Sequence, residues 1–219
     1  MSKSIYKLIN EQVNRWELGK IHEKPIDQSI QVITISSESG SRGHEAAKLL
    51  CRETGFDLFH HEILDAMVEK SKNDRVLLET LDERGMNIVD DVVSNFVNEH
   101  HLWPDEYSKL LFSILTTIAK HGRAVILGRG ANCVLHRQQV LRVRIVAPQI
   151  TRRKFIQHGR DLDMDDAQKY MVSTDSNRTA FVKRYFNCDA EDASNYDLIL
   201  NTGTLSVERA VQVIKCAMS

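Results

Sequence analysis

The sequence predicts an α/β fold in which a parallel sheet carries helices on both faces. Short runs of apolar and β-branched residues have the composition of buried strands, at residues 31–35, 56–59, 124–127, 140–146 and 196–200. Stretches with the spacing and composition of helices follow several of them, at residues 45–51, 62–70 and 206–218. Strands that alternate with helices form parallel sheets, and the ligands of such sheets bind at the carboxyl ends of the strands.

An N-terminal amphipathic helix and linker, residues 1–29, are predicted to precede the main domain, residues 30–219. Residues 4–19 carry apolar side chains at helical spacing, with Ser4 as candidate N-cap and Gly19 as the end of the helix. The acidic residues of this segment offset its basic ones, so packing on the domain or on a partner subunit is favoured over membrane association. A homodimer formed through this helix is one form of such packing.

A helical insert is predicted at about residues 74–120. The segment is helical in pattern throughout, and Pro104 is well placed at a helix start. The apolar face of its last helix is formed by Leu110, Leu111, Ile114, Leu115 and Ile118. Consecutive helices inserted in an α/β chain indicate a lid or a substrate-binding subdomain.

Composition and charge agree with a globular enzyme and disfavour two other classes of protein. Among the 219 residues 42% are hydrophobic and 27% are charged, close to the globular average. The net charge of -1 argues against a nucleic-acid-binding protein, because such proteins carry a clustered basic excess. No apolar run approaches the ~20 residues of a membrane-spanning helix, and the N-terminus has no apolar signal region. We therefore expect no membrane partner and a cytoplasmic location.

The cysteines and histidines are not spaced as metal ligands. The cysteines are scattered without C-x-x-C spacing, at Cys51, Cys133, Cys188 and Cys216. We expect buried thiols rather than disulfides or a zinc site. The pair His60-His61 followed by Glu62 differs from the H-E-x-x-H pattern, and no third ligand follows at a usual spacing. A helix start with polar side chains is favoured there, and no metal site is predicted from the protein alone.

A turn rich in glycine and serine connects the first strand to the first helix. It reads Ser36-Ser37-Glu38-Ser39-Gly40-Ser41-Arg42-Gly43-His44. A helix N-terminus presents unpaired N–H groups and the positive end of the peptide dipoles, so such a turn suits a phosphate group. The P-loop pattern G-x-x-x-x-G-K-[ST] is not met, because Ser37 stands at the first glycine and Gly43 at the lysine. An ordinary strand-to-helix connection is the alternative.

Several blocks of the chain resemble the cytidylate kinase-like family, P-loop proteins related to nucleoside monophosphate kinases. The loop agrees with a pattern close to I-S-R-E-x-G-S-G-G-R-E-x-A at Ile35, Ser36, Glu38, Gly40, Ser41, Gly43, Glu45 and Ala47. Further matching blocks follow in the same order, at residues 56–59 with 62–64, 81–84, 102–107, 128–132 and 196–203. The resemblance implies a P-loop NTPase-type three-layer fold. It also implies ATP and Mg²⁺ as cofactors, with phosphoryl transfer to a nucleoside monophosphate, cytidylate-like, or to a related small phosphorylated acceptor.

The resemblance assigns phosphate binding to the loop after the first strand. Its residues are Ser39, Gly40, Ser41, Arg42, Gly43, His44 and Glu45. Relatives commonly have glycine at position 42 and arginine at position 44, so the positive charge stands elsewhere in this loop. Arg42 and His44 are the candidates to take the place of the loop lysine of P-loop proteins, and Arg42 is favoured because histidine is mostly neutral at pH 7.

Phosphoryl transfer needs positive charge around a group that spreads negative charge in its transition state. Arg129 stands between two glycines after a strand, where missing side chains let a ligand approach closely. The resemblance implies that Arg129 contacts the acceptor phosphate. The alternative is that Arg129 lies in an ordinary surface turn. The residues expected to bind the acceptor are His60, Arg129, Arg152 and Arg153, and the expected catalytic residues are Arg42, Arg129 and Arg178.

A lid is the third expected part of the site. Residues 173–178 have the pattern of a helix break and restart, and Asp175, Arg178 and Arg184 resemble the arginine-bearing lid of monophosphate kinases. An exposed helical face with an Asp175–Arg178 pair is the alternative.

Two functions remain open from the sequence. One is an ATP-dependent kinase of the nucleoside monophosphate kinase type, for which no catalytic base is needed because the acceptor oxygen is already anionic. The other is a catalytically weak nucleotide-binding module that regulates or binds a partner.

Overall fold

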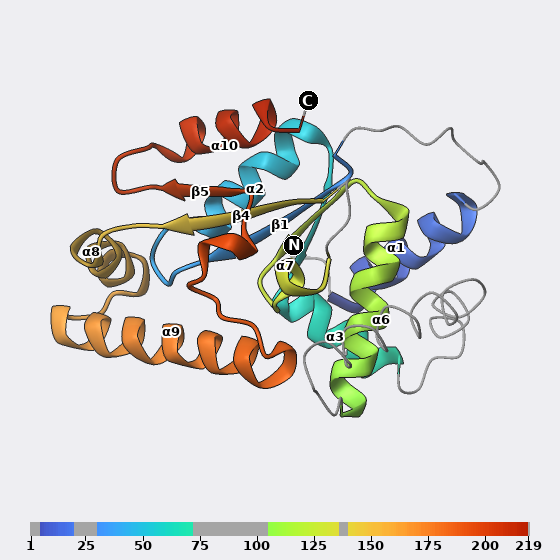
Figure 1. Ribbon diagram of the computed structural model, residues 1–219, viewed down its shortest axis with the longest axis horizontal. Coiled ribbons are helices and arrows are strands. Elements are labelled where there is room, and N and C mark those ends of the chain that lie inside the picture. Colours follow the sequence, from blue (N-terminus) through green and yellow to red (C-terminus); the bar gives the residue numbers. More distant parts are fainter. Residues whose placement is uncertain (1–4, 20–29, 72–104, 136–139, 219) are drawn as a thin grey trace. The chain divides into compact units, whose positions relative to one another are not determined.

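The computed structural model describes residues 5–19, 30–71, 105–135 and 140–218 (Figure 1). In chain order, its elements are α1 (Ile5–Gly19), β1 (Val32–Ser37), α2 (Gly43–Thr54), β2 (Asp57–His60), α3 (His61–Ser71), α6 (Glu106–His121), β3 (Ala124–Leu127), α7 (Ala131–Val134), β4 (Val140–Val146), α8 (Gln149–Arg160), α9 (Met164–Phe186), the 3₁₀ turn η1 (Ala193–Asn195), β5 (Leu198–Asn201) and α10 (Val207–Cys216). None of the helices in these ranges is long and apolar enough to cross a membrane.

The chain divides into two compact units. The helical unit comprises Met1–Gln28 and Phe59–Gly122, and the sheet unit comprises Ser29–Leu58 and Arg123–Ser219. Helices α1, α3 and α6 belong to the helical unit. Strands β1, β3, β4 and β5 belong to the sheet unit with the remaining described helices, and β2 spans the boundary.

The strands follow the order β2-β3-β1-β4-β5. β1 pairs in parallel with both β3 and β4, and β4 pairs in parallel with β5. The register places Ile35 beside Leu127 and Ser37 beside Ile145, so the carboxyl ends of these strands share one edge. Because the chain builds strands on one side of β1 and then crosses to β4 on the other, the carboxyl end of β1 is a switch point, where α/β sheets bind ligands. The predicted α/β fold with a parallel sheet is confirmed.

One face of the sheet forms an apolar core with α2 and α10, which Figure 1 shows on the same side of the strands. Its members include Ile33, Ile35, Val143 and Ile145 from the strands and Ala46, Leu50, Val211 and Ile214 from the helices. Side chains alternate along a strand. The opposite face therefore receives Ser36 of β1 and Arg144 of β4, and the polar chemistry of the sheet unit lies there.

The predicted N-terminal helix is present as α1. Within the helical unit its residues Val13 and Trp16 are buried, and the Trp16 ring stacks on His121 with ring centroids 4.7 Å apart. The Tyr107 hydroxyl of α6 donates a hydrogen bond to Asp65 of α3 at 2.8 Å. The apolar face of α1 thus packs within its own chain, and the homodimer through α1 stays a prediction.

Local sequence patterns predicted the bounds of several elements correctly. The runs at residues 124–127 and 140–146 coincide with β3 and β4, and the Ser206 hydroxyl caps α10 by accepting the Arg209 N–H. Of the insert predicted at residues 74–120, the structure describes only the part within α6 and the residue before it. The remainder, with Pro104, lies outside the described residues.

The helix break predicted at residues 173–178 is wrong. The helix α9 runs without interruption over Met164–Phe186. Serine, threonine and asparagine lower helix stability by less than about 1 kcal/mol each. Ala167 and Met171 are buried against Ile156 of α8, and this packing outweighs the weak local propensity.

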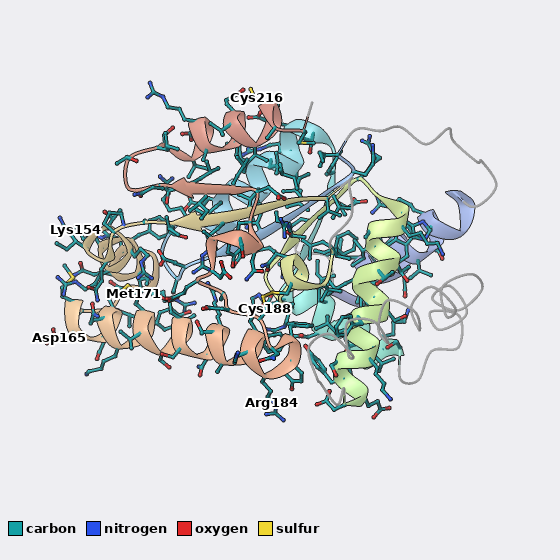
Figure 2. All side chains as sticks on the ribbon, viewed as in Figure 1. Lys154, Asp165, Met171, Arg184, Cys188 and Cys216 are labelled. Carbon is teal, nitrogen blue, oxygen red and sulfur yellow. A yellow bond between two sulfur atoms is a disulfide. The ribbon has the colours of Figure 1, made fainter. Side chains whose placement is uncertain are left out.

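The expectation of buried, unpaired cysteines is also wrong. Cys133 and Cys188 form a disulfide with their Cα atoms 6.4 Å apart, whereas Cys51 is half-buried and Cys216 is exposed. Figure 2 shows Cys188 close to the C-terminal end of α9 and Cys216 at the end of α10. Sequence spacing gives no sign of the pair, because only the tertiary fold brings α7 beside the segment that follows α9.

A tight turn follows β3. Gly128, Arg129 and Gly130 have φ values of 83°, 54° and 65°, all in the left-handed region. A Cβ at Gly130 would overlap the buried ring of Phe186, whereas Gly128 faces open space. The turn thus requires Gly130 for close packing against α9 as well as for backbone conformation.

The Gly130→Ala variant should lose about 2–4 kcal/mol of unfolding free energy, because its Cβ meets the Phe186 ring in a strained backbone conformation. The matched control is Gly159→Ala, at an open position near the end of α8. It should gain up to ~1 kcal/mol, since alanine favours the helix. Urea unfolding of both variants measures the difference. Wild-type stability in Gly130→Ala would show that Phe186 does not constrain this turn.

Candidate functional site

The loop after β1 is held in place by hydrogen bonds within the sheet unit. The Glu38 N–H donates to the Ile145 carbonyl of β4 at 3.1 Å, and the Ser41 N–H donates to the Glu38 carbonyl at 3.2 Å. The buried Ser41 hydroxyl also donates to the Glu38 carbonyl, at 2.8 Å, and the Thr202 hydroxyl donates to the Ser41 carbonyl at 2.7 Å. The Ser41 side chain therefore stabilises the loop from inside the fold.

The glycines of this loop are required by contacts within the chain. Gly40 has a φ of 79°, and a Cβ there would overlap the backbone carbonyl of Arg152. A Cβ at Gly43 would overlap the side chain of Ser37. A substitution such as Gly43→Val thus disturbs the loop with or without a ligand, and it is a poor test of phosphate binding.

Arg42 stands where the loop enters α2. It is the N-cap residue, with a φ of 62°, a conformation that costs a residue with a side chain about 1–2 kcal/mol. Its Nε and Nη2 donate to one oxygen of Glu45 at 3.0 and 2.6 Å, and its guanidinium lies 5.6 Å from the Phe155 ring centroid. Arg42, the loop cation that the sequence predicted, thus forms an ion pair with Glu45 in the first turn of the same helix.

Two arginines bind the end of β1 from different elements. Arg144 of β4 donates through Nη1 to the Ser36 hydroxyl at 2.8 Å. Arg178 of α9 donates through Nη1 to the Ser37 carbonyl, also at 2.8 Å. Together with Arg129 they form what we call the arginine cluster.

Arg129 joins the cluster from the turn after β3. Its guanidinium lies 4.7 Å from the ring centroid of Phe181, which follows Arg178 by about one turn of α9 and so shares its side of the helix. A non-glycine residue with positive φ is uncommon, and such strain gathers at functional sites. The turn holds an arginine in that conformation beside α9.

The arginine cluster concentrates positive charge at the carboxyl end of β1. Arg144 lies 5.7 Å from the Tyr196 ring centroid, and no carboxylate in the described part of the chain forms an ion pair with it. Part of Arg178 is exposed, yet burial is the main cause that lowers its pKa. The charge of Asp175 opposes this shift, whereas the charges of Arg144 and Arg129 add to it. Such a concentration of like charge favours an anionic ligand.

Arg152 of α8, by contrast, is neutralised by two carboxylates. It forms ion pairs with Asp175 of α9 and, at 3.4 Å, with Glu38 of the loop. Asp175 also accepts the Ser39 backbone N–H at 2.7 Å. Arg152 therefore links α8, α9 and the loop. The Ser39 N–H, one of the donors of the predicted phosphate loop, is already hydrogen-bonded to the Asp175 carboxylate.

The other predicted site residues have different surroundings. Arg153 lines a hollow between α8 and α9, beside Gln149, Ile150 and Gln168. Arg184 lies near the C-terminal end of α9 and points away from the sheet (Figure 2), with its guanidinium 5.3 Å from the Tyr185 ring centroid. His60 belongs to the helical unit, where its Nδ1 lies 3.7 Å from the Glu62 carboxylate. Among the described contacts, Arg153 and Arg184 form none with the arginine cluster.

Arg144 was not among the site residues predicted from the sequence. Its strand has arginine at alternate positions, Arg142 and Arg144, which indicates one polar face. Arg142, near the start of β4, pairs with both oxygens of Asp197 at 2.7 and 3.1 Å. The register instead places Arg144 beside Ser36, near the carboxyl end. Only strand pairing distinguishes the two.

The residues present suit an anion better than a metal ion held by protein alone. Within the described ranges, no three histidine, cysteine, aspartate or glutamate side chains gather as metal ligands. Nucleotide-bound Mg²⁺ usually has one or two carboxylate ligands besides phosphate and water. Glu38 and Asp175 are carboxylates at the loop, although Arg152 engages both. The site therefore fits Mg²⁺ only as the companion of a bound phosphate.

Known proteins resemble this chain in both sequence and fold. The cytidylate kinase of Methanocaldococcus jannaschii is 26% identical over 146 residues, which are 65% of this chain and 79% of that protein. The crystal structure of an uncharacterized protein from Eubacterium ventriosum matches with a TM-score of 0.66 and 20% identity, over 85% of this chain and 97% of the other. The model of the cytidylate kinase-like family matches residues 32–204, which include the loop and all of the arginine cluster. The chain has the α/β P-loop fold and belongs to the cytidylate kinase-like family.

Proposed function

We propose that this protein transfers a phosphoryl group from ATP, with Mg²⁺, to a nucleoside monophosphate, cytidylate-like, or to a related small phosphorylated acceptor. The observation that carries the proposal is the arginine cluster at the switch point of the sheet, where Arg144 has neutral neighbours. Family membership and the related cytidylate kinase support it.

The arginine cluster binds the acceptor phosphate in this proposal. Arg129 and Arg178 approach from the turn after β3 and from α9, so their planar guanidinium groups can hold separate phosphate oxygens. Their charges orient the acceptor and offset the negative charge that develops during transfer. The anionic acceptor oxygen attacks without a general base.

The donor phosphates bind at the N-terminus of α2. The first turn of this helix has N–H groups without helical partners, and its dipole favours negative charge. When bound, ATP with Mg²⁺ supplies the transferable phosphoryl group. The Ser39 N–H donates to the Asp175 carboxylate of α9, so this N–H becomes available to a phosphate only when α9 shifts. Because α9 also carries Arg178, this shift gives it the role of a lid.

A catalytically weak nucleotide-binding module is the second candidate, and the loop itself favours it. The charge of Arg42 is shared with Glu45, and the Ser41 hydroxyl is buried in hydrogen bonds of the fold. Gly43 stands where P-loop enzymes have lysine. Such a loop binds phosphate through its backbone but lacks a free cation for catalysis.

Acceptor-dependent turnover distinguishes the two functions. Purified protein is incubated with ATP, Mg²⁺ and each member of a panel of nucleoside monophosphates, and ADP is measured. We expect ADP to form only when an acceptor is present, with a matching diphosphate product by mass spectrometry. Binding of ATP by calorimetry, without turnover on any acceptor, would contradict the kinase and support the regulatory module.

The Arg144→Ala variant should raise the KM for the acceptor by at least ~10-fold, because a charged hydrogen bond to phosphate contributes about 1.5–3 kcal/mol. The control is Arg142→Ala, on the same face of β4, where Asp197 already pairs with the side chain. Its KM should stay within about twofold, since a partly exposed ion pair contributes little. Steady-state kinetics at varied acceptor concentration measure both. Equal effects would remove Arg144 from the site.

The Arg42→Gly variant separates backbone strain from catalysis. Glycine adopts the observed φ of 62° freely, so the free energy of unfolding should rise by about 1 kcal/mol. If the guanidinium stabilises the transferred group, kcat should fall at least ~10²-fold while ATP affinity falls less, since the backbone N–H groups remain. Urea unfolding and kinetics on one preparation give both values. An unchanged kcat would exclude Arg42 from the catalytic residues.

A further inference from the structure

We propose that Cys133 and Cys188 are a reversible thiol–disulfide site that reacts with low-molecular-weight disulfides, and that its oxidised form holds the arginine cluster in place. The redox chemistry stands on the geometry of the cysteines alone. The effect on ligand binding rests on the function proposed above.

The disulfide joins the two segments that supply Arg129 and Arg178. Cys133 lies in α7, directly after the Gly128–Arg129–Gly130 turn, and Cys188 lies just beyond the end of α9. Between them, Phe186 packs against Gly130 so closely that a Cβ there would overlap its ring. The bond therefore fixes the end of α9 against the turn after β3, and both arginines depend on that placement.

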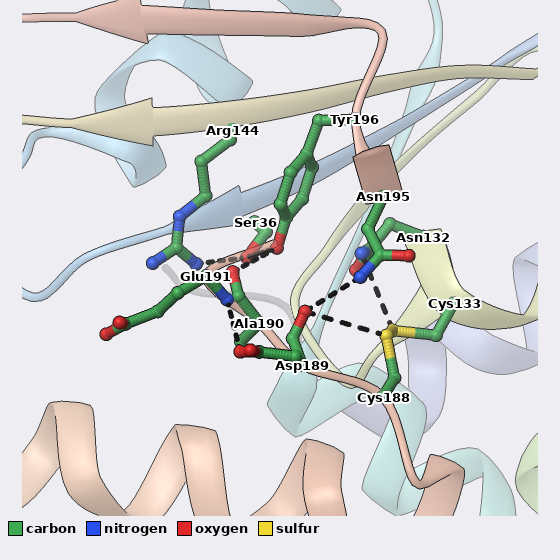
Figure 3. The surroundings of a disulfide bond; sticks show 10 residues. All are labelled: Ser36, Asn132, Cys133, Arg144, Cys188, Asp189, Ala190, Glu191, Asn195 and Tyr196. Atoms are coloured by element: carbon green, nitrogen blue, oxygen red, sulfur yellow. Dashed lines mark hydrogen bonds between the residues drawn. A yellow bond between two sulfur atoms is a disulfide. The ribbon is translucent and has the colours of Figure 1, made fainter. Parts of the chain in front are cut away.

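A chain of contacts leads from the same disulfide to Arg144 (Figure 3). The segment after Cys188 is braced by Asn195, whose side chain donates to the Asp189 carbonyl at 2.8 Å. The Tyr196 hydroxyl donates to the carbonyl of Ala190 at 2.7 Å, and the Tyr196 ring lies beside the Arg144 guanidinium. Releasing Cys188 frees the start of this braced segment, so the surroundings of Arg144 loosen together with α9.

The exchange itself balances without any group beyond a small disulfide. The Cys188 thiolate attacks one sulfur of the small disulfide, forming a mixed disulfide and expelling one thiolate. The Cys133 thiolate then attacks the Cys188 sulfur, closes the protein disulfide and expels the second thiolate. The protein loses two electrons and two protons in all, and the small disulfide becomes two thiols. Asn132 donates to the Cys133 sulfur at 3.5 Å, a contact that also stabilises the thiolate.

Burial makes this site respond slowly and selectively. Cys133 and Cys188 are 3% and 8% exposed, so small thiols and disulfides reach them only when the segment after α9 opens. Burial and the charge of Asp57 raise the pKa of the Cys51 thiol to about 12, which keeps it unreactive. Cys216 is exposed but has no partner cysteine near it in the described structure.

Thiol counting tests the chemistry without reference to any kinase activity. The full chain is equilibrated in buffers of reduced and oxidised glutathione, acid-quenched, unfolded and alkylated, and its alkylated thiols are counted by mass spectrometry. We expect interconversion between four and two free thiols with one midpoint, and peptide mapping should place the bond at Cys133 and Cys188. Four free thiols at every ratio, or a bond that native protein never loses to excess thiol, would overturn the proposal.

Hydrogen exchange tests the coupling to the arginine cluster. Reduction should speed exchange in α9 and in residues 187–196, and the double variant Cys133→Ser with Cys188→Ser should resemble reduced protein in both buffers. The control Cys216→Ser should follow wild type. Where turnover is measurable, reduction should raise the acceptor KM by at least about 5-fold. Identical exchange of oxidised and reduced wild type would refute the coupling, whereas altered exchange without turnover would leave it standing and count against the kinase alone.

Discussion

The gathering of guanidinium groups at the carboxyl end of β1 is the feature around which the polar contacts of this edge of the sheet are arranged. Arg144 and Arg178 are held by a hydroxyl and a backbone carbonyl, and Arg129 and Arg144 by aromatic rings. The nearby carboxylates of Glu38 and Asp175 serve Arg152 instead. The fold thus separates Arg152, which has two counter-charges, from Arg144, which forms no ion pair with a carboxylate in the described part of the chain, and Arg144 retains capacity for an anion.

Backbone strain accompanies this division of charge. Arg42 and Arg129 both have positive φ, and each stands at the point where a strand-end loop enters a helix. The adjoining glycines are fixed by contacts with Ser37, Arg152 and Phe186, so neither turn can relax independently. Strain held by surrounding packing is a known property of sites that must be ordered before their ligand arrives.

Sequence reasoning reached those features whose causes are local. The apolar runs of β3 and β4, the Ser206 cap and the glycines around Arg129 are each readable within a few residues. Arg144 and the Cys133–Cys188 pair were missed because strand register and tertiary contact decide them. The continuity of α9 was missed because Met171 and Ala167, buried against α8, outweigh the weak helix formers near residue 175. At the level of individual site residues, the sequence alone showed only which positively charged residues lie near the ends of strands.

The contrast between the two ends of β4 has a kinetic consequence. Arg142 is neutralised by Asp197 at the amino end, whereas Arg144 lacks such a partner near the carboxyl end. Although the whole chain carries a net charge of -1, the local field at this edge is positive and draws anions during diffusional encounter. Attraction of this kind is damped within a Debye length of about 8 Å at physiological ionic strength. The rate at which an anionic ligand finds this edge should therefore depend on salt far more than the molecule's overall charge would indicate.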